Sequence, residues 1–267
     1  MRLRIRSDGI HEGRALPLPK NSPYHATDRV KTVMNQKIKT KQAKYMNQNK
    51  IFLEGEGDLW FNRNRSKIAE GDAACEPDVR FIIDTLLPFR DEIRMILKIG
   101  CSNGWKIKSL AKSFDAIGCG IDPSASAIAS GNSGTEKSKI KLSQGSSHRL
   151  PYQDNEFDLV YFGFCLYLCD RSQLLQSIAE ADRVLRPGGF VVVTDFDPGS
   201  ARKRSFLSKP GLFSFKQDYS RIFIESNGYY LVEKHSFSHT VASFDNKPNE
   251  RVSTQILYKE MDSYIES

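Results

Sequence analysis

Two glycines and one carboxylate carry the first chemical signal in this sequence. Gly100 and Gly104 follow a short apolar run, residues 95–99, and Asp122 comes 22 positions after Gly100. Glycine permits a tight turn and close approach of a ligand, and the free N–H groups that open a following helix favour polar or anionic groups. An acid about 20 positions later can accept hydrogen bonds from both hydroxyls of a ribose. This spacing predicts a site for a nucleotide-like molecule.

The elements around this site alternate between apolar strands and helices. Strands are predicted at residues 95–99, 117–121, 140–142, 157–162, 190–195, 229–235 and 254–259. Helices are predicted at residues 77–86, 105–113, 124–130, 172–185 and 219–226. This order predicts an α/β fold: a doubly wound, Rossmann-like, mostly parallel seven-stranded sheet with an antiparallel C-terminal edge. Residues 197–219, between the fifth strand and the last helix, are expected to be a long polar insertion with aromatic residues.

The first 50 residues differ in composition from the rest of the chain. They hold twelve Lys or Arg and three Asp or Glu, so the net charge of +7 comes from this segment. We expect residues 1–50 to be a basic, disordered tail, with a loosely held helix near residues 30–46 as the alternative, and residues 51–267 to form the folded domain. Met34 offers an alternative start. Because the basic character belongs to a tail, nucleic acid is not expected as a partner.

Length and composition set further limits. The 267 residues, 39% of them hydrophobic, suffice for one large domain. No apolar stretch reaches the ~18 to 20 residues that span a bilayer, and no secretion signal is evident, so we expect a cytoplasmic protein without membrane contact. The five cysteines form no CxxC pair, and His235 and His239 fall in a predicted strand and loop, so no metal is predicted. The oligomeric state stays open.

Residues 51–75 combine acids, aromatic rings and amide side chains in a short span. The side chains that could face a ligand are those of Glu56, Asp58, Trp60, Arg63 and Asn64. One interpretation is a lid, or a wall of the substrate site, over the mouth of the nucleotide site. The alternative is a segment that only packs against the sheet, with Trp60 and Phe61 as anchors.

Residues 81–195 resemble the class I S-adenosylmethionine-dependent methyltransferases, close to those with a generic small-molecule methyltransferase domain. The resemblance rests on ILKIGCSNG at the glycine turn, GIDPS after the second strand, LPYQDNEFDLV into the fourth and RVLRPGGFVVVTDF into the fifth. The stretches EGDLWFNRN and GFCLYLCDR also resemble a bacterial subgroup tied to surface polysaccharide or sugar modification. The resemblance implies S-adenosyl-L-methionine as cofactor and a small-molecule acceptor, such as a sugar or nucleotide-linked sugar.

Carried over by position, the resemblance implies a set of cofactor contacts. Gly100, Cys101, Ser102 and Gly104 would border the methionine and ribose, Asp122 with Pro123 the ribose hydroxyls, Ser146 and Ser147 the adenine edge, and Phe162 and Gly163 the floor beneath the sulfonium. Two positions depart from the family. Lys98 stands where an acid usually binds the amino group of the cofactor, and Ser146 stands where Asp is frequent. A lysine that faced this amino group would weaken binding by ~1 kcal/mol or more.

The methyl group of a sulfonium is already electrophilic, so the protein must supply alignment and a dry site rather than a metal. A hydroxyl acceptor would also need a base to take its proton. The candidates near the strand ends are His148, Asp170, Asp195 and Asp197, with Tyr167 as an orienting group. Each also has a structural interpretation as a loop residue, helix cap or strand end. The sequence alone therefore assigns no base.

Two other functions stay open at this point. The first is an RNA or protein methyltransferase that docks through its basic tail. The second is a degenerate, non-catalytic interaction protein that binds no cofactor, a reading motivated by Lys98 and Ser146.

Overall fold

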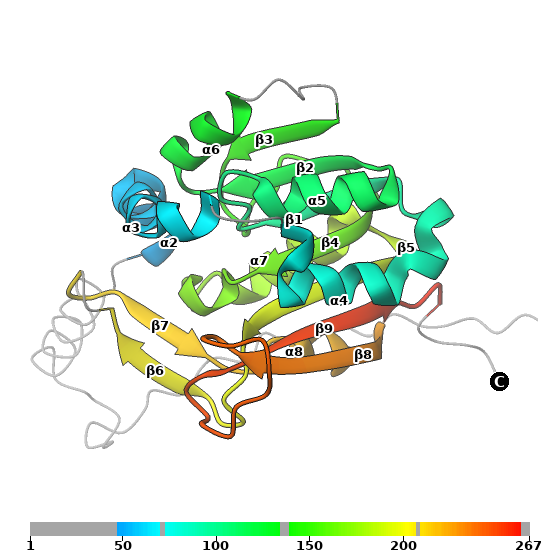
Figure 1. Ribbon diagram of the computed structural model, residues 1–267. Helices are drawn as coiled ribbons and strands as arrows, with labels where there is room; N and C mark the ends of the chain where they lie inside the picture. The colour runs from blue at the N-terminus through cyan, green and yellow to red at the C-terminus, as the bar shows by residue number, and fades with distance from the viewer. Residues whose placement is uncertain (1–46, 70–72, 134–138, 207–208, 263–267) are drawn as a thin grey trace, which may run out of the picture. The chain divides into compact units, whose positions relative to one another are not determined.

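The computed structural model describes residues 47–69, 73–133, 139–206 and 209–262, and these contain a seven-stranded sheet (Figure 1). The strands are β1 (Met95–Ile99), β2 (Ile117–Asp122), β3 (Ile140–Gln144), β4 (Phe157–Gly163), β5 (Leu185–Phe196), β8 (Tyr229–Ser238) and β9 (Arg251–Lys259). Their order is β3-β2-β1-β4-β5-β9-β8; the first five are parallel, and β9 is antiparallel to both neighbours. The predicted sheet with an antiparallel C-terminal edge is confirmed.

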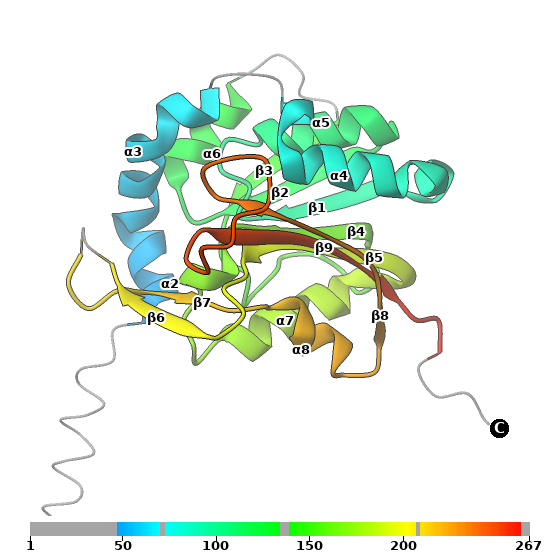
Figure 2. The same ribbon diagram turned by 60° about the horizontal axis from the view of Figure 1, so that its bottom comes forward.

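Helices cover both faces of the sheet (Figure 2). One face carries α4 (Pro77–Leu86), α5 (Trp105–Phe114) and α6 (Ala125–Asn132), and the other carries α7 (Leu174–Val184) and α8 (Ser220–Ile224). Successive side chains of the central strands point to opposite faces of the sheet, so each strand contributes to the hydrophobic core on both faces. Ile96 in β1 packs with α4 and α5, and its neighbour Leu97 packs with α7. Because the central strands are parallel, the carboxyl ends of β1, β2 and β4 meet at one edge of the sheet.

A helical segment, residues 48–69, lies beside these carboxyl ends (Figures 1 and 2). It consists of α2 (Gln48–Ile51), a π-helical turn (Phe52–Glu56) and α3 (Gly57–Ala69). Gly55 has a φ of 147°, which glycine adopts readily, and it interrupts the helical geometry before α3. Gln48 and Asn49 are buried, so the folded part begins before residue 51. The rest of the predicted tail, residues 1–46 including Met34, lies outside the described residues.

The stretch after β5, which was expected to be a polar insertion, contains two short strands that the sequence did not predict. β6 (Arg202–Ser205) and β7 (Phe213–Lys216) pair as an antiparallel hairpin outside the main sheet. The Gln48 side chain fastens this hairpin to α2: its Nε2 donates to the Phe213 carbonyl at 3.1 Å, and its Oε1 accepts from the Phe213 N–H at 2.8 Å. The sequence concealed the hairpin because β6 is exposed along its whole length and shows no alternation of apolar residues.

Three short 3₁₀ turns connect the remaining elements. They span Ala73–Cys75, Leu87–Glu92 and Leu166–Leu168. Within the four described stretches of chain, no helix is long and apolar enough to cross a membrane.

Candidate functional site

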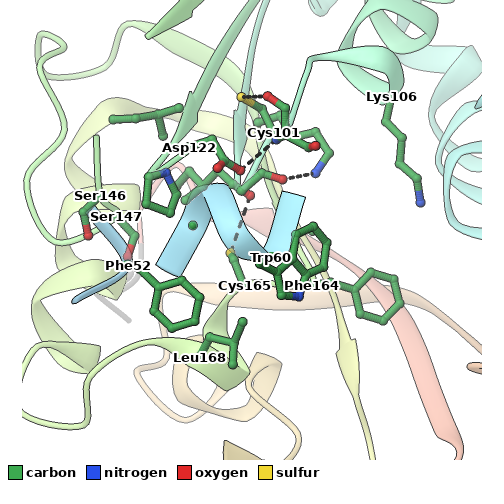
Figure 3. A pocket seen from close by; sticks show the side chains of 18 of the residues that line it. Phe52, Trp60, Cys101, Lys106, Asp122, Ser146, Ser147, Phe164, Cys165 and Leu168 are labelled. Carbon is green, nitrogen blue, oxygen red and sulfur yellow. Dashed lines mark hydrogen bonds between the residues drawn. The ribbon is translucent and has the colours of Figure 1, made fainter. Parts of the chain in front are cut away.

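A cavity of about 420 Å³ opens at the carboxyl ends of β1, β2 and β4 (Figure 3). Its walls come from the glycine turn after β1, the end of β2, the loops after β3 and β4, and the helical segment 48–69. Residues that are far apart in the sequence thus meet at the edge where parallel α/β sheets bind ligands.

The turn between β1 and α5 requires glycine at two positions. Gly100 and Gly104 have φ values of +72° and +81°, in the left-handed region. A Cβ on Gly100 would lie 2.8 Å from Cys165 Cβ, and one on Gly104 would lie 2.7 Å from a methyl group of Leu142. Gly100 lines the cavity together with the next two residues of the turn. Gly104 does not line it, and instead serves as the N-terminal cap residue of α5.

Asp122 joins this turn to the end of β2. Its carboxylate accepts the Ser102 N–H at 2.8 Å and the Ser124 N–H at 2.9 Å. Burial raises the pKa of Asp122, and these two hydrogen bonds oppose that change. The side chain lines the cavity beside Pro123. The glycine turn and the acid are therefore in direct contact, because β1 and β2 are parallel neighbours in the sheet.

One buried hydroxyl in the turn has no partner among the described residues. Ser102 lines the cavity, and its Oγ is buried without a hydrogen-bond partner within the described residues. An unpaired buried hydroxyl costs roughly 1–3 kcal/mol, so this group calls for a partner, which an ordered water or a bound ligand can supply. Beside the Asp122 carboxylate, it offers the polar contacts that a nucleoside with an amino-acid tail would need.

The loop after β3 forms another part of the wall. Ser146 and Ser147 line the cavity there (Figure 3). Both hydroxyls already have partners, since Ser146 Oγ lies 2.9 Å from His148 Nδ1 and Ser147 Oγ lies 2.8 Å from Ser177 Oγ. These contacts hold the loop in place while leaving its cavity side open to a ring.

Phe162 does not reach the cavity, which corrects the position implied by the resemblance. Side chains alternate along β4, so Phe162 points into the core on the α7 face, where it is 1% exposed. Tyr161 and Gly163 border the cavity instead. The next residue, Phe164, also lines it and has a φ of +50°. The sequence did not reveal Phe164, because an aromatic residue with positive φ is uncommon.

The five candidate lid residues divide between two faces of the helical segment. Trp60 and Asn64, one turn apart on α3, line the cavity. Glu56 is buried and forms an ion pair with Arg63 at 2.8 Å. Asp58 accepts hydrogen bonds from the start of α6. Three of the five therefore hold the segment in place rather than face the cavity.

Among the catalytic candidates, Tyr167 lines the cavity. Burial raises the pKa of Tyr167, so its hydroxyl stays protonated and can donate a hydrogen bond. Asp195 lies behind it, with a carboxylate that accepts the Tyr167 N–H at 3.2 Å and the Phe196 N–H at 2.8 Å. Burial raises the pKa of Asp195 to about 7, but its side chain does not line the cavity.

The other three candidates have structural partners and lie outside the cavity lining. The His148 ring contacts the side-chain amide of Asn49 at 3.1 Å, and burial lowers the pKa of this histidine. Asp170 accepts the Gln48 N–H at 2.8 Å, which ties α2 to the loop after β4. Asp197 forms an ion pair at 2.6 Å with a lysine of β8.

A cluster of buried charged side chains lies at the cavity wall, and no sequence motif predicted it. Lys106 Nζ lies 2.8 and 2.7 Å from the two carboxylate oxygens of Asp78, which also accepts a hydrogen bond from the Tyr161 hydroxyl. Lys98 Nζ lies 4.5 Å from the centre of the Tyr161 ring, and both lysines line the cavity. Only the packing of α4 on α5 brings Asp78 to Lys106, from 28 positions earlier in the chain.

Aromatic side chains form much of the remaining wall. They come from α3, α5, and the loops after β4 and β8, and are Trp60, Trp105, Phe164, Tyr167 and His239. Figure 3 shows Trp60 and Phe164 on the same side of the cavity. The rings of Phe164 and His239 have centroids 6.0 Å apart, in an edge-to-face arrangement. Such a surface suits a ligand with a ring.

The described stretches of the chain contain no cluster of side chains that could ligate a metal ion. They contain no group of three His, Cys, Asp or Glu side chains that could hold an ion. His235, one of the two histidines considered above, stacks on Phe81 with ring centroids 5.2 Å apart. Burial raises the pKa of Cys101 and Cys165 well above the ordinary value, so these cavity-lining thiols stay protonated.

Comparison with known proteins shows what the central part of the chain is similar to. Residues 97–193 match the family model described as "Methyltransferase domain". This match runs from β1 into β5, and it makes this part of the chain similar to that family. The bacterial subgroup suggested by EGDLWFNRN and GFCLYLCDR is not identified by it.

The similarity to individual known proteins covers either part of the sequence or the fold alone. A demethylmenaquinone methyltransferase of Staphylococcus aureus (strain MRSA252) is 34% identical over 131 residues, 48% of this chain and 48% of the relative. The chain thus spans about half the length of the curated relatives it matches. The 1,6-didemethyltoxoflavin-N1-methyltransferase of Burkholderia thailandensis, solved with 1,6-didemethyltoxoflavin and S-adenosylhomocysteine, has a TM-score of 0.57 at 13% identity, covering 91% of this chain and 94% of its own. A SAM-dependent methyltransferase from Methanosarcina mazei has a TM-score of 0.52 at 16% identity, covering 64% and 94%.

Proposed function

We propose that this protein transfers a methyl group from S-adenosyl-L-methionine to a small molecule. One observation carries the proposal: the glycine turn, the Asp122 carboxylate and the unpartnered Ser102 hydroxyl converge on a single cavity at the carboxyl edge of the sheet. These are the groups that a ribose and an amino-acid tail require. The methyl donor, when bound, supplies an electrophilic carbon, and the protein supplies its alignment.

In this proposal, the residues of the cavity have separate tasks. Asp122 holds the ribose, and Ser146 and Ser147 border the adenine. Gly163 lies beneath the reacting end, and the helical segment 48–69 acts as the lid that excludes water. Tyr167 donates a hydrogen bond that orients the acceptor, because its raised pKa keeps the hydroxyl protonated. No described residue is assigned the role of base.

For the acceptor, we propose a small molecule with a ring that stacks on the aromatic wall. Trp60 and Phe164 offer flat surfaces to the C–H face of a sugar or to an aromatic ring. A sugar or nucleotide-linked sugar is the acceptor expected from the sequence. The name of the staphylococcal relative adds a second candidate, a ring of the demethylmenaquinone type. A panel of sugars, nucleotide sugars and quinols, incubated with protein and donor, separates them by the gain of about 14 mass units that one methyl transfer produces. A cytoplasmic location stays part of this proposal.

Binding of S-adenosylhomocysteine to Asp122→Asn tests the proposed function by calorimetry. We expect affinity to fall by about 10- to 100-fold, since charge-assisted hydrogen bonds to the ribose are weakened. The matched control is Asp115→Asn, because Asp115 is exposed and does not line the cavity. Equal affinity in Asp122→Asn and wild type would contradict the proposal. Failure of wild type to bind would favour the non-catalytic interaction protein.

The alternative of an RNA or protein methyltransferase depends on the tail, which lies outside the described residues. It predicts that removal of residues 1–46 abolishes methylation while leaving S-adenosylhomocysteine binding intact. Methylation of a small molecule by the shortened protein at the wild-type rate would exclude that alternative.

A further inference from the structure

A buried lysine stands at the cavity wall where the resemblance implied an acid. Lys98 is 3% exposed and lines the cavity from β1. No carboxylate lies within ion-pair distance of its ammonium among the described residues. Burying a charge without a partner is costly, so the position calls for an explanation that the fold alone does not supply.

The groups that contact the Lys98 ammonium are a carbonyl and an aromatic ring, which do not cancel its charge. Nζ donates to the Gly100 carbonyl at 2.8 Å and lies over the Tyr161 ring. A Cβ on Gly163 would fall 2.2 Å from Nζ, so glycine at this position of β4 leaves the space that the ammonium occupies. One N–H is used by the carbonyl, and Gly163 itself borders the cavity. The ammonium therefore lies between the ends of β1 and β4, beside the glycine turn.

The nearby carboxylates are already engaged. Asp78 accepts both hydrogen bonds from Lys106, and Glu76 lies 3.5 Å from the same ammonium with 41% of its side chain exposed. Asp122 accepts backbone N–H groups instead. This end of the cavity thus holds two buried lysines and three carboxylates, those of Glu76, Asp78 and Asp122. Within the described residues, carboxylates lie within ion-pair distance of Lys106 and not of Lys98.

Lys106 lies at the end of the cavity opposite the adenine side. Figure 3 shows Lys106 and the pair Ser146 and Ser147 on opposite sides of Asp122. If the ribose lies at Asp122, as the proposed function states, the tail of the donor extends toward the lysines. The unpartnered Ser102 hydroxyl is on the same turn whose Gly100 carbonyl binds Lys98.

We propose that Lys98 and Ser102 form a receptor for the carboxylate of the donor's amino-acid tail, so that this chain holds the tail by its anionic group. The inference rests on the proposed function and adds a role for a residue that the fold class does not explain. An ammonium and a hydroxyl both donate, and a carboxylate accepts from each. The bound anion then supplies the counter-charge that Lys98 lacks among the described residues.

Calorimetry with two ligands tests this receptor. The ligands are S-adenosylhomocysteine and its decarboxylated analogue, which keeps the amine and lacks the carboxylate. In wild type, the analogue should bind about 10- to 100-fold more weakly. In Lys98→Met, S-adenosylhomocysteine should lose most of that advantage while the analogue binds as before, so the preference between them collapses. The matched control is Lys141→Met, an exposed lysine of β3.

The outcomes separate this inference from the proposed function. A Lys98→Met protein that retains the wild-type preference for S-adenosylhomocysteine overturns the receptor and leaves the proposed function standing. Equal weakening of both ligands also overturns it, because that pattern indicates a merely structural lysine. Failure of wild type to bind either ligand contradicts the proposed function itself.

A second measurement on wild type covers the case in which Lys98→Met does not fold. Burial lowers the pKa of Lys98. The titratable groups that face it are Lys106, Cys165, Cys101, Asp78, Asp122 and Tyr161. A bound carboxylate would raise that pKa, so binding should take up protons, measured as the difference in heat between buffers of unlike ionisation enthalpy. S-adenosylhomocysteine should take up more protons than its decarboxylated analogue at alkaline pH. Equal uptake by the two ligands would overturn the receptor.

Discussion

The Asp58 carboxylate of α3 accepts a hydrogen bond from the Ser124 hydroxyl at 2.6 Å, and a second from the Ser126 N–H at 2.9 Å. Ser124 is also the N-cap of α6, and its N–H binds Asp122. The first residues of α3 are therefore tied to the loop that carries the acid of the cavity. A carboxylate at a helix N-terminus is also favourable for the helix dipole.

We expect Asp58→Ala to loosen the helical segment over the cavity. Loss of the two hydrogen bonds should cost about 1 kcal/mol and raise the rate of amide hydrogen exchange in α3. The affinity for S-adenosylhomocysteine should fall by about 3- to 10-fold if the segment covers the bound donor. Glu54→Ala is the control, because the Glu54–Lys50 pair is exposed on both sides and worth little. Unchanged exchange in α3 would show that Asp58 does not hold it.

Asp195 should make the protein less stable as the pH rises. Its pKa is raised to about 7 in the folded state from an ordinary 3.8, mainly by burial. Below about pH 4 the carboxyl group is protonated in both the folded and the unfolded chain, and its contribution to stability is complete. As the pH rises through 7 this contribution is lost, because the unfolded chain releases the proton at lower pH than the folded chain does. The difference between the two pKa values corresponds to about 4 kcal/mol of folding free energy. Urea unfolding of Asp195→Asn should therefore show a flatter pH profile and greater stability than wild type at pH 8.

The control for this pH profile is Asp91→Asn, since the Asp91 side chain is 97% exposed. It should follow the wild-type curve between pH 4 and 8. If Asp195→Asn loses stability with rising pH as steeply as wild type does, then Asp195 does not carry the effect.

The pair of Asp78 and Lys106 should show strong coupling. Asp78→Leu leaves a buried ammonium without its bidentate partner, and we expect a loss of about 3–5 kcal/mol in the free energy of unfolding. Removing both charges in Asp78→Leu with Lys106→Met should cost less than the sum of the two single changes. Urea denaturation of the four proteins measures this difference. Strict additivity would mean that the two charges do not depend on each other.

Gly131 in α6 should not tolerate a methyl group. A Cβ there would lie 2.4 Å from the backbone carbonyl oxygen of Asn103, within the glycine turn. Because a backbone atom cannot rotate away, Gly131→Ala should cost about 1–3 kcal/mol and weaken S-adenosylhomocysteine binding by displacing the turn. Thermal unfolding and calorimetry measure both effects. Ala129→Ser, at an exposed position of the same helix, should change neither, and a neutral Gly131→Ala would show that α6 can move freely.

Much of the fold could be predicted because its signals are local. Apolar runs such as residues 95–99 and the spacing between Gly100 and Asp122 depend on residues close together in the chain. The contact of Ser102 with Asp122 then follows from one topological step, the parallel pairing of β1 and β2. The prediction failed where strands were short and exposed, as in β6, and at Phe162, where the face of the strand had been misjudged.

The sequence by itself determined the order of strands and helices, the glycine turn and the acid that follows it, because hydrophobic periodicity and backbone freedom are properties of short segments. Tertiary structure alone decided which polar side chains share the cavity. Lys98, Gly163 and the Asp78–Lys106 pair come from different elements, and their contacts arise from the packing of helices on the sheet. The charge balance at the wall therefore could not be read from spacing, since the electrostatic partner of a buried group depends on distance in space rather than along the chain.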